Sequence, residues 1–322
     1  YRSARRRKAG DRVFGPGTGG RGLMPLPGEY LDYPARRHGM DNPFYGWEPA
    51  ALRARRELAS GLKAAATIIV PLEFFPLDPP LKPFRHPGAM VTPYPDLRHY
   101  TSRDYGNRVG VYRLLRAFAE AGITATFAAN ARVASRYPAL IDAVLAAGHE
   151  LAAHGVSTAH IHHEGLPEDE ERALVEETRL ALPDAVTWMS PARNESFRTP
   201  GLLAQAGFSI CLDWEADMRP LTLETPHGPV TALANYNELS DFKLLVERSQ
   251  SEDQWAQQIV EAGRSHLSLF GSEGAGAFAF VLTPYVAGLP FRISALHALL
   301  AGLKALPGLQ ILPARDAVAA FA

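Results

Sequence analysis

The stretch AGHELAAHG, residues 147–155, decides the fold class that the sequence predicts. It is a short apolar run that begins beside a helix-ending glycine, Gly148, and stops at a His-Gly pair. This length, with turn signals on both sides, is typical of a buried strand. The sequence therefore predicts a strand over 149–155 with His154 at its carboxyl end, where α/β folds bind ligands. A histidine with a purely structural role at a strand end fits this stretch equally well.

Strands and helices alternate on both sides of this stretch. The predicted strands are 67–75, 124–130, 186–190, 209–214, 230–235, 277–282 and 309–312. The predicted helices are 110–120, 138–147, 168–182, 199–207, 251–267 and 292–306. Such alternation predicts a parallel sheet, and at this length a closed or nearly closed (β/α) barrel of seven or eight strands. A doubly wound open sheet is the alternative, but no Gly-x-Gly-x-x-Gly motif follows the first strand.

Residues 1–63 precede the alternating pattern and differ from it in composition. Most of this segment is rich in Gly, Pro and Arg, with little periodicity. The sequence therefore predicts an irregular N-terminal arm over 1–63 and a barrel domain over 64–322. An arm of this kind would suit packing on a second copy of the chain, so a homo-oligomer is an open expectation. The Pro-rich segment that ends near Tyr100 is expected to be a long loop with a functional role.

The composition and the lack of an apparent signal or membrane-spanning segment favour a globular cytoplasmic protein. Hydrophobic residues make up 47%, charged residues 21%, and the formal net charge is -1. This balance argues against nucleic acid or an anionic membrane as the partner. No apolar run of about 18 residues suggests a membrane span, and no apolar segment follows the basic residues 5–8, as a secretory signal would require. The single cysteine, Cys211, lies in an apolar run, which predicts an inert buried thiol.

Polar side chains follow most of the predicted strands. Because the carboxyl ends of barrel strands converge on one mouth, these side chains are expected to form the site. Carboxylates beside apolar runs are costly to bury without a function, although a solvated polar rim would show the same pattern. The candidate catalytic residues are Glu73, His154, Glu195, Glu238 and Asp241, and the candidate substrate-binding residues are Arg193, Asn194, Trp214, Tyr236 and Tyr285.

Four histidines within ten residues raise the question of a metal site. Glu73, His154 and His160 would give a carboxylate and two imidazoles, a set that suits zinc or a similar divalent ion. The spacing of these histidines is not a defined ligand motif, so the sequence establishes no cofactor. His162 and His163 are interpreted as loop residues without a ligand role.

Several segments resemble the polysaccharide deacetylase (NodB-homology) superfamily. They are RVGVYRLL at 108–115, GITATF at 122–127 and GHELAAHG at 148–155, with support from TPGLLAQAGF at 199–208 and LTPYVAGLPFR at 282–292. The likeness runs from about residue 64 to the C-terminus and is closer to the branch of PuuE-type allantoinases and cyclic imide hydrolases. The resemblance implies a deformed (β/α) barrel and hydrolysis of carbon–nitrogen bonds other than peptide bonds.

The sequence departs from the metal-dependent deacetylases of this superfamily at three positions. Glu73 stands alone where those enzymes carry paired aspartates. Thr158 stands where they carry a second metal-binding histidine, and Thr283 where they carry a late histidine that acts as general acid. The allantoinase-like branch accepts a glutamate in the first motif and lacks the second histidine, so the sequence fits that branch better.

The leading hypothesis is hydrolysis of an amide or cyclic amide in a small molecule. Such a site needs a base, a group for the developing oxyanion and an acid for the leaving nitrogen. Glu73 is the expected base, and His154 would polarise the carbonyl, bind a metal or donate a proton. Arg193 would hold the oxyanion or a substrate carboxylate, and Tyr285 would replace the missing late histidine. A metal-dependent carbohydrate N-deacetylase and a catalytically degenerate member that binds a ligand or partner are the alternatives.

Overall fold

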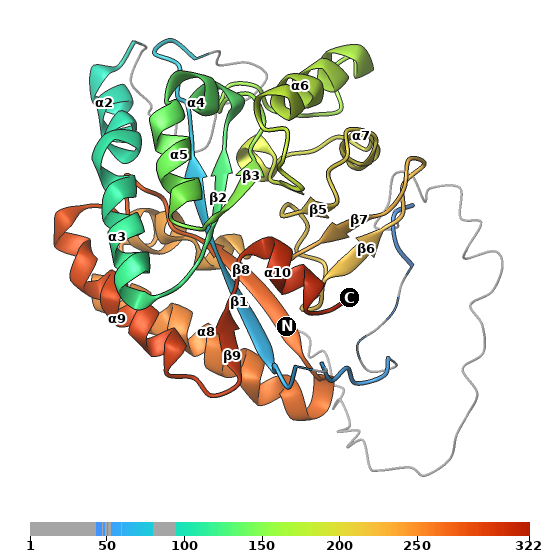
Figure 1. Ribbon diagram of the computed structural model, residues 1–322, viewed down its shortest axis with the longest axis vertical. Helices are drawn as coiled ribbons and strands as arrows, with labels where there is room; N and C mark the ends of the chain where they lie inside the picture. Colours follow the sequence, from blue (N-terminus) through green and yellow to red (C-terminus); the bar gives the residue numbers. More distant parts are fainter. Residues whose placement is uncertain (1–42, 47, 49, 51–52, 59, 80–94) are drawn as a thin grey trace, which may run out of the picture. The chain divides into compact units, whose positions relative to one another are not determined.

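The computed structural model describes residues 43–46, 48, 50, 53–58, 60–79 and 95–322 (Figure 1). Phe44–Ala322 form one compact unit. Most of the arm predicted over 1–63 lies outside the described residues, as does the Pro-rich segment 80–94.

A single sheet forms the centre of this unit. Its strands among the described residues are β1 (Ala64–Leu72), β2 (Thr126–Ala129), β3 (Glu150–Ala153), β4 (Thr187–Trp188), β5 (Ile210–Cys211), β6 (Leu221–Leu223), β7 (Val230–Ala232), β8 (Gly276–Val281) and β9 (Leu309–Ile311). Parallel pairing runs in the order β7-β5-β4-β3-β2-β1-β8. An isolated parallel bridge between Asn235 and Ala279 joins the two ends of this order. The sheet therefore curls back on itself, which confirms the predicted deformed barrel.

Helices follow the strands and surround the sheet (Figure 1). The α-helices are α2 (Leu97–Tyr105), α3 (Val111–Ala121), α4 (Ala131–Arg136), α5 (Pro138–Ala146), α6 (Glu168–Ala181), α7 (Thr199–Gln205), α8 (Glu252–Glu273), α9 (Ile293–Lys304) and α10 (Ala314–Ala319). The shorter helical segments are η1 (Gly106–Gly110), η2 (Pro191–Arg193), η3 (Asn237–Leu239), η4 (Phe242–Glu247) and η5 (Pro290–Arg292). Two of these, η1 and η4, are π-helical.

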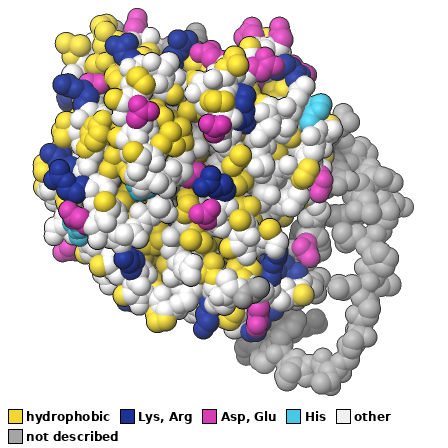
Figure 2. Space-filling view, in the orientation of Figure 1, with side chains coloured by type: hydrophobic (Ala, Val, Ile, Leu, Met, Phe, Trp, Pro, Cys, Tyr) yellow, Lys and Arg dark blue, Asp and Glu magenta, His cyan; other side chains and the backbone are white. Residues whose placement is uncertain are grey.

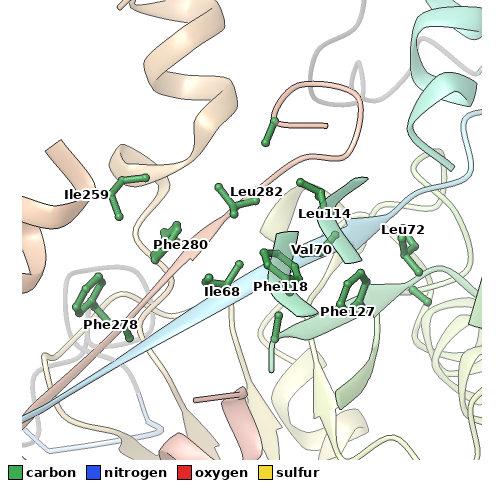
Figure 3. Close-up of a cluster of buried hydrophobic side chains, with 14 of the residues drawn as sticks. Ile68, Val70, Leu72, Leu114, Phe118, Phe127, Ile259, Phe278, Phe280 and Leu282 are labelled. Carbon is green, nitrogen blue, oxygen red and sulfur yellow. The ribbon is translucent and has the colours of Figure 1, made fainter. Parts of the chain in front are cut away.

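Alternate residues of β1 pack into two separate apolar layers. Ile68 and Val70 face outward, in one cluster with Phe118 of α3 and Phe280 of β8 (Figure 3). The residues of opposite parity, including Ala65, Ala128, Ala152, Ala277 and Ala279, form the second cluster inside the barrel. Both faces of β1 are fully buried, as expected for a strand of a parallel sheet that helices cover. Small side chains on the inward face suit the narrow interior of a barrel with few strands.

The amino end of the barrel is closed by a buried carboxylate and by α10. Glu150 is the first residue of β3, and its Oε1 accepts the Thr187 hydroxyl at 2.5 Å. Its Oε2 accepts the Thr126 hydroxyl at 2.8 Å and the Arg315 backbone N–H at 3.0 Å. Because Arg315 lies in the first turn of α10, these bonds hold that helix against the barrel. A pocket can therefore form at the other end of the barrel, where the carboxyl ends of the strands lie.

Two predictions about single elements differ from the structure. The helix predicted over 251–267 continues to Glu273 and ends at Gly274, which has a φ of 86°. The segment that was expected to be a loop up to Tyr100 becomes α2 at Leu97. Asp96 starts α2 because its side chain accepts the N–H groups of the next turn.

The surface of the described unit carries mixed charge. Basic and acidic side chains are interspersed on the face shown in Figure 2. Among the described residues, no helix has both the length and the apolar character that a bilayer span needs.

Candidate active site at the carboxyl ends of the strands

A pocket of about 230 Å³ opens where the strands of the barrel end. Its walls include Glu73 after β1, His154 after β3, Asn235 after β7 and Thr283 after β8. Each of these residues continues the inward-facing parity of its strand, because side chains along a strand alternate between the two faces. Local strand geometry therefore brings side chains from four distant parts of the sequence to one cavity.

Glu73 and His154 face each other in this pocket. His154 Nε2 lies 3.6 Å from Glu73 Oε1, and the two side chains are 3% and 17% exposed respectively. His154 Nδ1 lies 2.8 Å from the carbonyl oxygen of Met189. Because a carbonyl only accepts hydrogen bonds, Nδ1 carries a proton, and Nε2 is the ring nitrogen that faces Glu73 in the pocket. The predicted convergence of these two side chains is thus present in the structure.

The backbone that carries Glu73 is held on several sides. Asn130 Oδ1 accepts the Phe74 N–H at 2.8 Å, and Asn130 Nδ2 donates to the His154 carbonyl. Both the N–H and the hydroxyl of Thr158 donate to the Phe74 carbonyl, at 3.2 and 3.0 Å. Asn130 therefore links the ends of β1 and β3, and Thr158 holds the next peptide group of the same segment.

Arg193 lies at the pocket wall on a strained turn. Ala192 and Arg193 have positive φ values of 58° and 52°, which cost a non-glycine residue about 1 kcal/mol or more each. The guanidinium donates to the Asn235 carbonyl and pairs with Glu215 at 2.6 Å. Strain of this kind persists where surrounding contacts hold the backbone in place, and it is often found at functional sites.

Tyr285 and Thr283 complete the wall that follows β8. Burial, and secondarily the negative charge of Glu73, raise the pKa of Tyr285. Its hydroxyl therefore stays protonated and can donate a hydrogen bond. Thr283 is bound to Asp241, which is fully buried behind the pocket wall. Burial raises the pKa of Asp241 from 3.8 to about 7, although four hydrogen bonds from Thr283, Phe242 and Ala287 oppose this rise.

Comparison with known proteins supports this description of the fold. Residues 98–207 match the polysaccharide deacetylase family. The crystal structure of PuuE allantoinase is similar, with a TM-score of 0.72 and 20% identity over 86% of this chain and 97% of that one. A Pseudomonas aeruginosa PAO1 protein described as a probable polysaccharide deacetylase is also similar, with a TM-score of 0.71 and 20% identity over 90% of this chain and 98% of the other. No curated protein sequence matches this chain. The resemblance expected from the sequence is thereby confirmed, and these structural similarities show a shared fold.

Many polysaccharide deacetylases depend on a metal ion, but this pocket offers few side chains that could bind one. No third imidazole, thiol or carboxylate of the described residues lies within 4.8 Å of both Glu73 and His154. His160 is exposed, and its Nδ1 is 2.7 Å from the Ser157 hydroxyl. A catalytic zinc site takes three protein ligands, and the described residues supply two. They do not fit such a site, and the chemistry below uses only the side chains of the chain.

A different acidic group has the spacing of a metal site. Glu195, Cys211 and Asp213 bring one ligand atom each within 4.8 Å of one another. Burial raises the pKa of both carboxyl groups, and the charge of Asp213 raises that of Glu195 further. The hydrogen bond between the two carboxyl groups raises the pKa of Glu195 and lowers that of Asp213, so Glu195 is the donor, while the Asp213 oxygens also accept the Ser190 N–H. Because these hydrogen bonds occupy the group, its chemistry favours a proton-sharing pair over a cation site.

The ten candidate catalytic and substrate-binding residues fall into three groups by their position relative to the pocket. Four of the ten line the pocket: Glu73, His154, Arg193 and Tyr285. Asp241 reaches it only through Thr283. The remaining candidates have other contacts: Asn194 with the His162 carbonyl, Glu195 with the Trp214 indole, Tyr236 with the His266 ring and Glu238 with Arg248.

Asn235 and Lys243 are among the pocket residues that were not sequence candidates, and Asn130 is a supporting residue that was also missed. Asn235 lines the pocket and is fully buried, and parity with Leu233 inside the barrel was the available signal. Lys243 lies on η4, and no pattern in the sequence predicted that this segment is π-helical. Asn130 ends β2 just beyond the inward-facing Ala128, and its role depends on two neighbouring strands that only the fold brings together.

Proposed function

We propose that this chain hydrolyses an amide or cyclic amide of a small molecule, a carbon–nitrogen bond outside peptides. The observation that carries the proposal is the Glu73–His154 pair, 3.6 Å apart at the pocket of the barrel. The similarity to PuuE allantoinase and the match to the deacetylase family favour the same class of reaction. A cavity of about 230 Å³ suits a small molecule, since pockets for drug-sized ligands are larger, about 300 to 1,000 Å³.

Glu73 and His154 are suited to activate a water molecule. A water between them can donate one hydrogen bond to the Glu73 carboxylate and one to the Nε2 lone pair of His154. Glu73 then takes a proton as the water oxygen attacks the carbonyl carbon. The bonds from Asn130 and Thr158 hold the Glu73 segment in place, and such pre-organisation lowers the cost of reaching the transition state.

Two donors near the pair can stabilise the oxyanion that forms. The Tyr285 hydroxyl keeps its proton because its pKa is raised, so it serves as a neutral hydrogen-bond donor. Arg193 lines the same pocket with a charged guanidinium. Donors placed before the reaction are typically worth about 100-fold or more in rate.

The proposal is tested by turnover of a panel of cyclic amides. The panel contains hydantoin, succinimide and N-aryl succinimides, and ring opening is followed by chromatography. Glu73→Gln and His154→Ala are expected to lower kcat by about 100-fold or more. Glu238→Gln is the matched control, because Glu238 is exposed and paired with Arg248 away from the pocket. Full turnover by both pocket variants would show the assignment to be wrong.

The family match favours one further activity, carbohydrate N-deacetylation. It predicts release of acetate from N-acetylglucosamine oligomers in the presence of a divalent ion. Turnover of these oligomers but of no cyclic amide would select this activity. Absence of turnover with both sets would select the catalytically degenerate alternative, for which Thr158 and Thr283 stand in place of family histidines.

A further inference from the structure

The hydrolysis described above requires a proton for the departing nitrogen. An amide nitrogen leaves poorly as an anion, so the carbon–nitrogen bond breaks only as a proton reaches the nitrogen. Tyr285 is poorly suited to supply it, because a raised pKa makes its hydroxyl a weak acid. The inference below rests on the proposed function and concerns the source of this proton.

Thr283 and Asp241 form a hydrogen-bonded pair that leads from the pocket wall into the protein. Thr283 lines the pocket, and its hydroxyl oxygen lies 2.8 Å from Asp241 Oδ1. Asp241 has no exposed surface. A carboxyl group in this place can exchange protons with the pocket only through a neighbour, and the Thr283 hydroxyl both donates and accepts.

The surroundings of Asp241 accommodate both of its protonation states. Its oxygens accept the backbone N–H groups of Phe242 at 2.7 Å, Thr283 at 2.7 Å and Ala287 at 3.2 Å. These donors stabilise the carboxylate, while burial favours the neutral acid. The balance places the Asp241 pKa at about 7. Tyr285 is the titratable neighbour on which the charge of Asp241 acts, and among the described residues no charged side chain is a main determinant of the Asp241 pKa.

We propose that Asp241 and Thr283 form a proton relay that serves the leaving nitrogen. As the carbon–nitrogen bond breaks, its electron pair stays on nitrogen, which takes the hydroxyl proton of Thr283. The Thr283 oxygen takes the carboxyl proton of Asp241 in the same step. Asp241 is left as a carboxylate that faces its three backbone N–H donors. Between turnovers, the proton that Glu73 took from water returns to Asp241 through Thr283 and the water of the pocket.

The competing explanation is that Asp241 only anchors the loop after β8. Its bonds to the N–H groups of Thr283 and Ala287 would serve that purpose without any proton transfer. An anchor and a relay differ in how their loss depends on the leaving group. Loss of an anchor disturbs all substrates, whereas loss of a relay matters most for a nitrogen that needs a full proton.

The test compares two probes that share one acyl group. N-(4-methoxyphenyl)succinimide has a poor leaving nitrogen, and N-(4-nitrophenyl)succinimide has a good one. Thr283→Val keeps the shape of the side chain and removes the hydroxyl, while Thr283→Ser keeps the hydroxyl. We expect Thr283→Val to lower kcat for the methoxy probe by about 100-fold, with KM within about twofold, and to lower kcat for the nitro probe by about threefold or less. Thr283→Ser is expected to restore both rates to within about threefold of wild type.

Asp241→Asn provides a second measurement on the same relay. It is expected to spare the nitro probe and impair the methoxy probe, as Thr283→Val does. In the wild type at pH 6, the infrared difference spectrum against Asp241→Asn is expected to show a protonated carboxyl band. Equal losses on both probes, or no loss in Thr283→Val, would overturn the relay while leaving the proposed function standing. If the wild type hydrolyses no cyclic amide at all, the proposed function fails, and the relay with it.

Discussion

Two glutamates at opposite ends of the barrel have very different surroundings. At the amino end, Glu150 accepts two threonine hydroxyls and a backbone N–H from α10. At the carboxyl end, the basic atom of the described residues that lies nearest to the Glu73 carboxylate is His154 Nε2 at 3.6 Å, beyond hydrogen-bond distance. A carboxylate with both oxygens engaged holds the fold together, whereas one that faces an open pocket is available for chemistry. The same residue type therefore has different roles because only one end of the barrel is closed.

Glu73→Gln is expected to give the largest effect, and on activity alone. Loss of the base should lower kcat on the cyclic amide panel by about 1,000-fold, equivalent to about 4 kcal/mol in the barrier. The free energy of unfolding should change by less than about 0.5 kcal/mol, because the carboxylate loses no hydrogen bond to another described residue. Urea titration and steady-state kinetics measure the two quantities. A large loss of stability would mean that Glu73 is a structural group like Glu150.

Asp241 should make stability depend on pH at the open end of the barrel. Its pKa of about 7 in the folded state lies above the unfolded value of 3.8, so the folded state holds the proton more tightly. The stabilisation is therefore present at low pH and is lost as pH rises from about 4 through about 7, by up to about 4 kcal/mol. Urea titrations of wild type and Asp241→Asn at pH 5 and pH 8 measure it. The variant should show a smaller difference between the two pH values; an equal difference would contradict this role.

Glu150→Gln should reduce stability and spare activity. The amide can turn its oxygen toward the Thr126 hydroxyl and the Arg315 N–H, but the Thr187 hydroxyl then loses its carboxylate acceptor. Loss of a buried hydrogen bond to a charged group costs about 2 kcal/mol in the free energy of unfolding. Glu261→Gln, in an exposed pair with Arg264, serves as the control and should change stability by less than about 0.5 kcal/mol. If turnover fell as far as in Glu73→Gln, the two ends of the barrel would not be separate in function.

Thr158→Val should give a smaller loss, confined to kcat. Removal of the hydroxyl frees the Phe74 carbonyl from one of its two donors and loosens the segment that positions Glu73. We expect kcat to fall about 10-fold with KM unchanged, since small displacements of a catalytic group reduce rate before binding. Thr178→Val removes a similar buried bond, to the Leu174 carbonyl in α6, and should leave kcat unchanged. Equal kcat values for the two variants would argue against a positioning role.

The barrel and the Glu73–His154 pair could be predicted from the sequence because both depend on local patterns. Long apolar runs that end in a polar residue specify a strand and the direction of its last side chain. The Glu73 and His154 runs have this form, and parity places both inside the barrel.

The positions of Glu195 and Trp214 could not be predicted in this way. The strands β4 and β5 are only two residues long, and the positive φ values of Ala192 and Arg193 reverse the chain between them. The alternation of side chains along a strand cannot be followed past such a turn. In the structure, Glu195 and Trp214 contact each other outside the pocket. The Asp241–Thr283 pair lay beyond sequence reasoning for another reason, since 42 residues separate two side chains that only the closed barrel brings together.

One wall of the pocket lies where the barrel closes, at the bridge between Asn235 and Ala279, and this wall can open. Closure depends on the bridge at Ala279, whose N–H and carbonyl bond to Ala234 and Tyr236 at 2.8 and 2.9 Å. Between these two residues stands Asn235, which lines the cavity and accepts the Arg193 guanidinium through its carbonyl. Widening the mouth at this point breaks two hydrogen bonds and leaves the ladders of β1, β2 and β3 intact. The cavity can thus gain room for a bulkier ring if the bridge at Ala279 opens, while the wall that carries Glu73 and His154 keeps its shape.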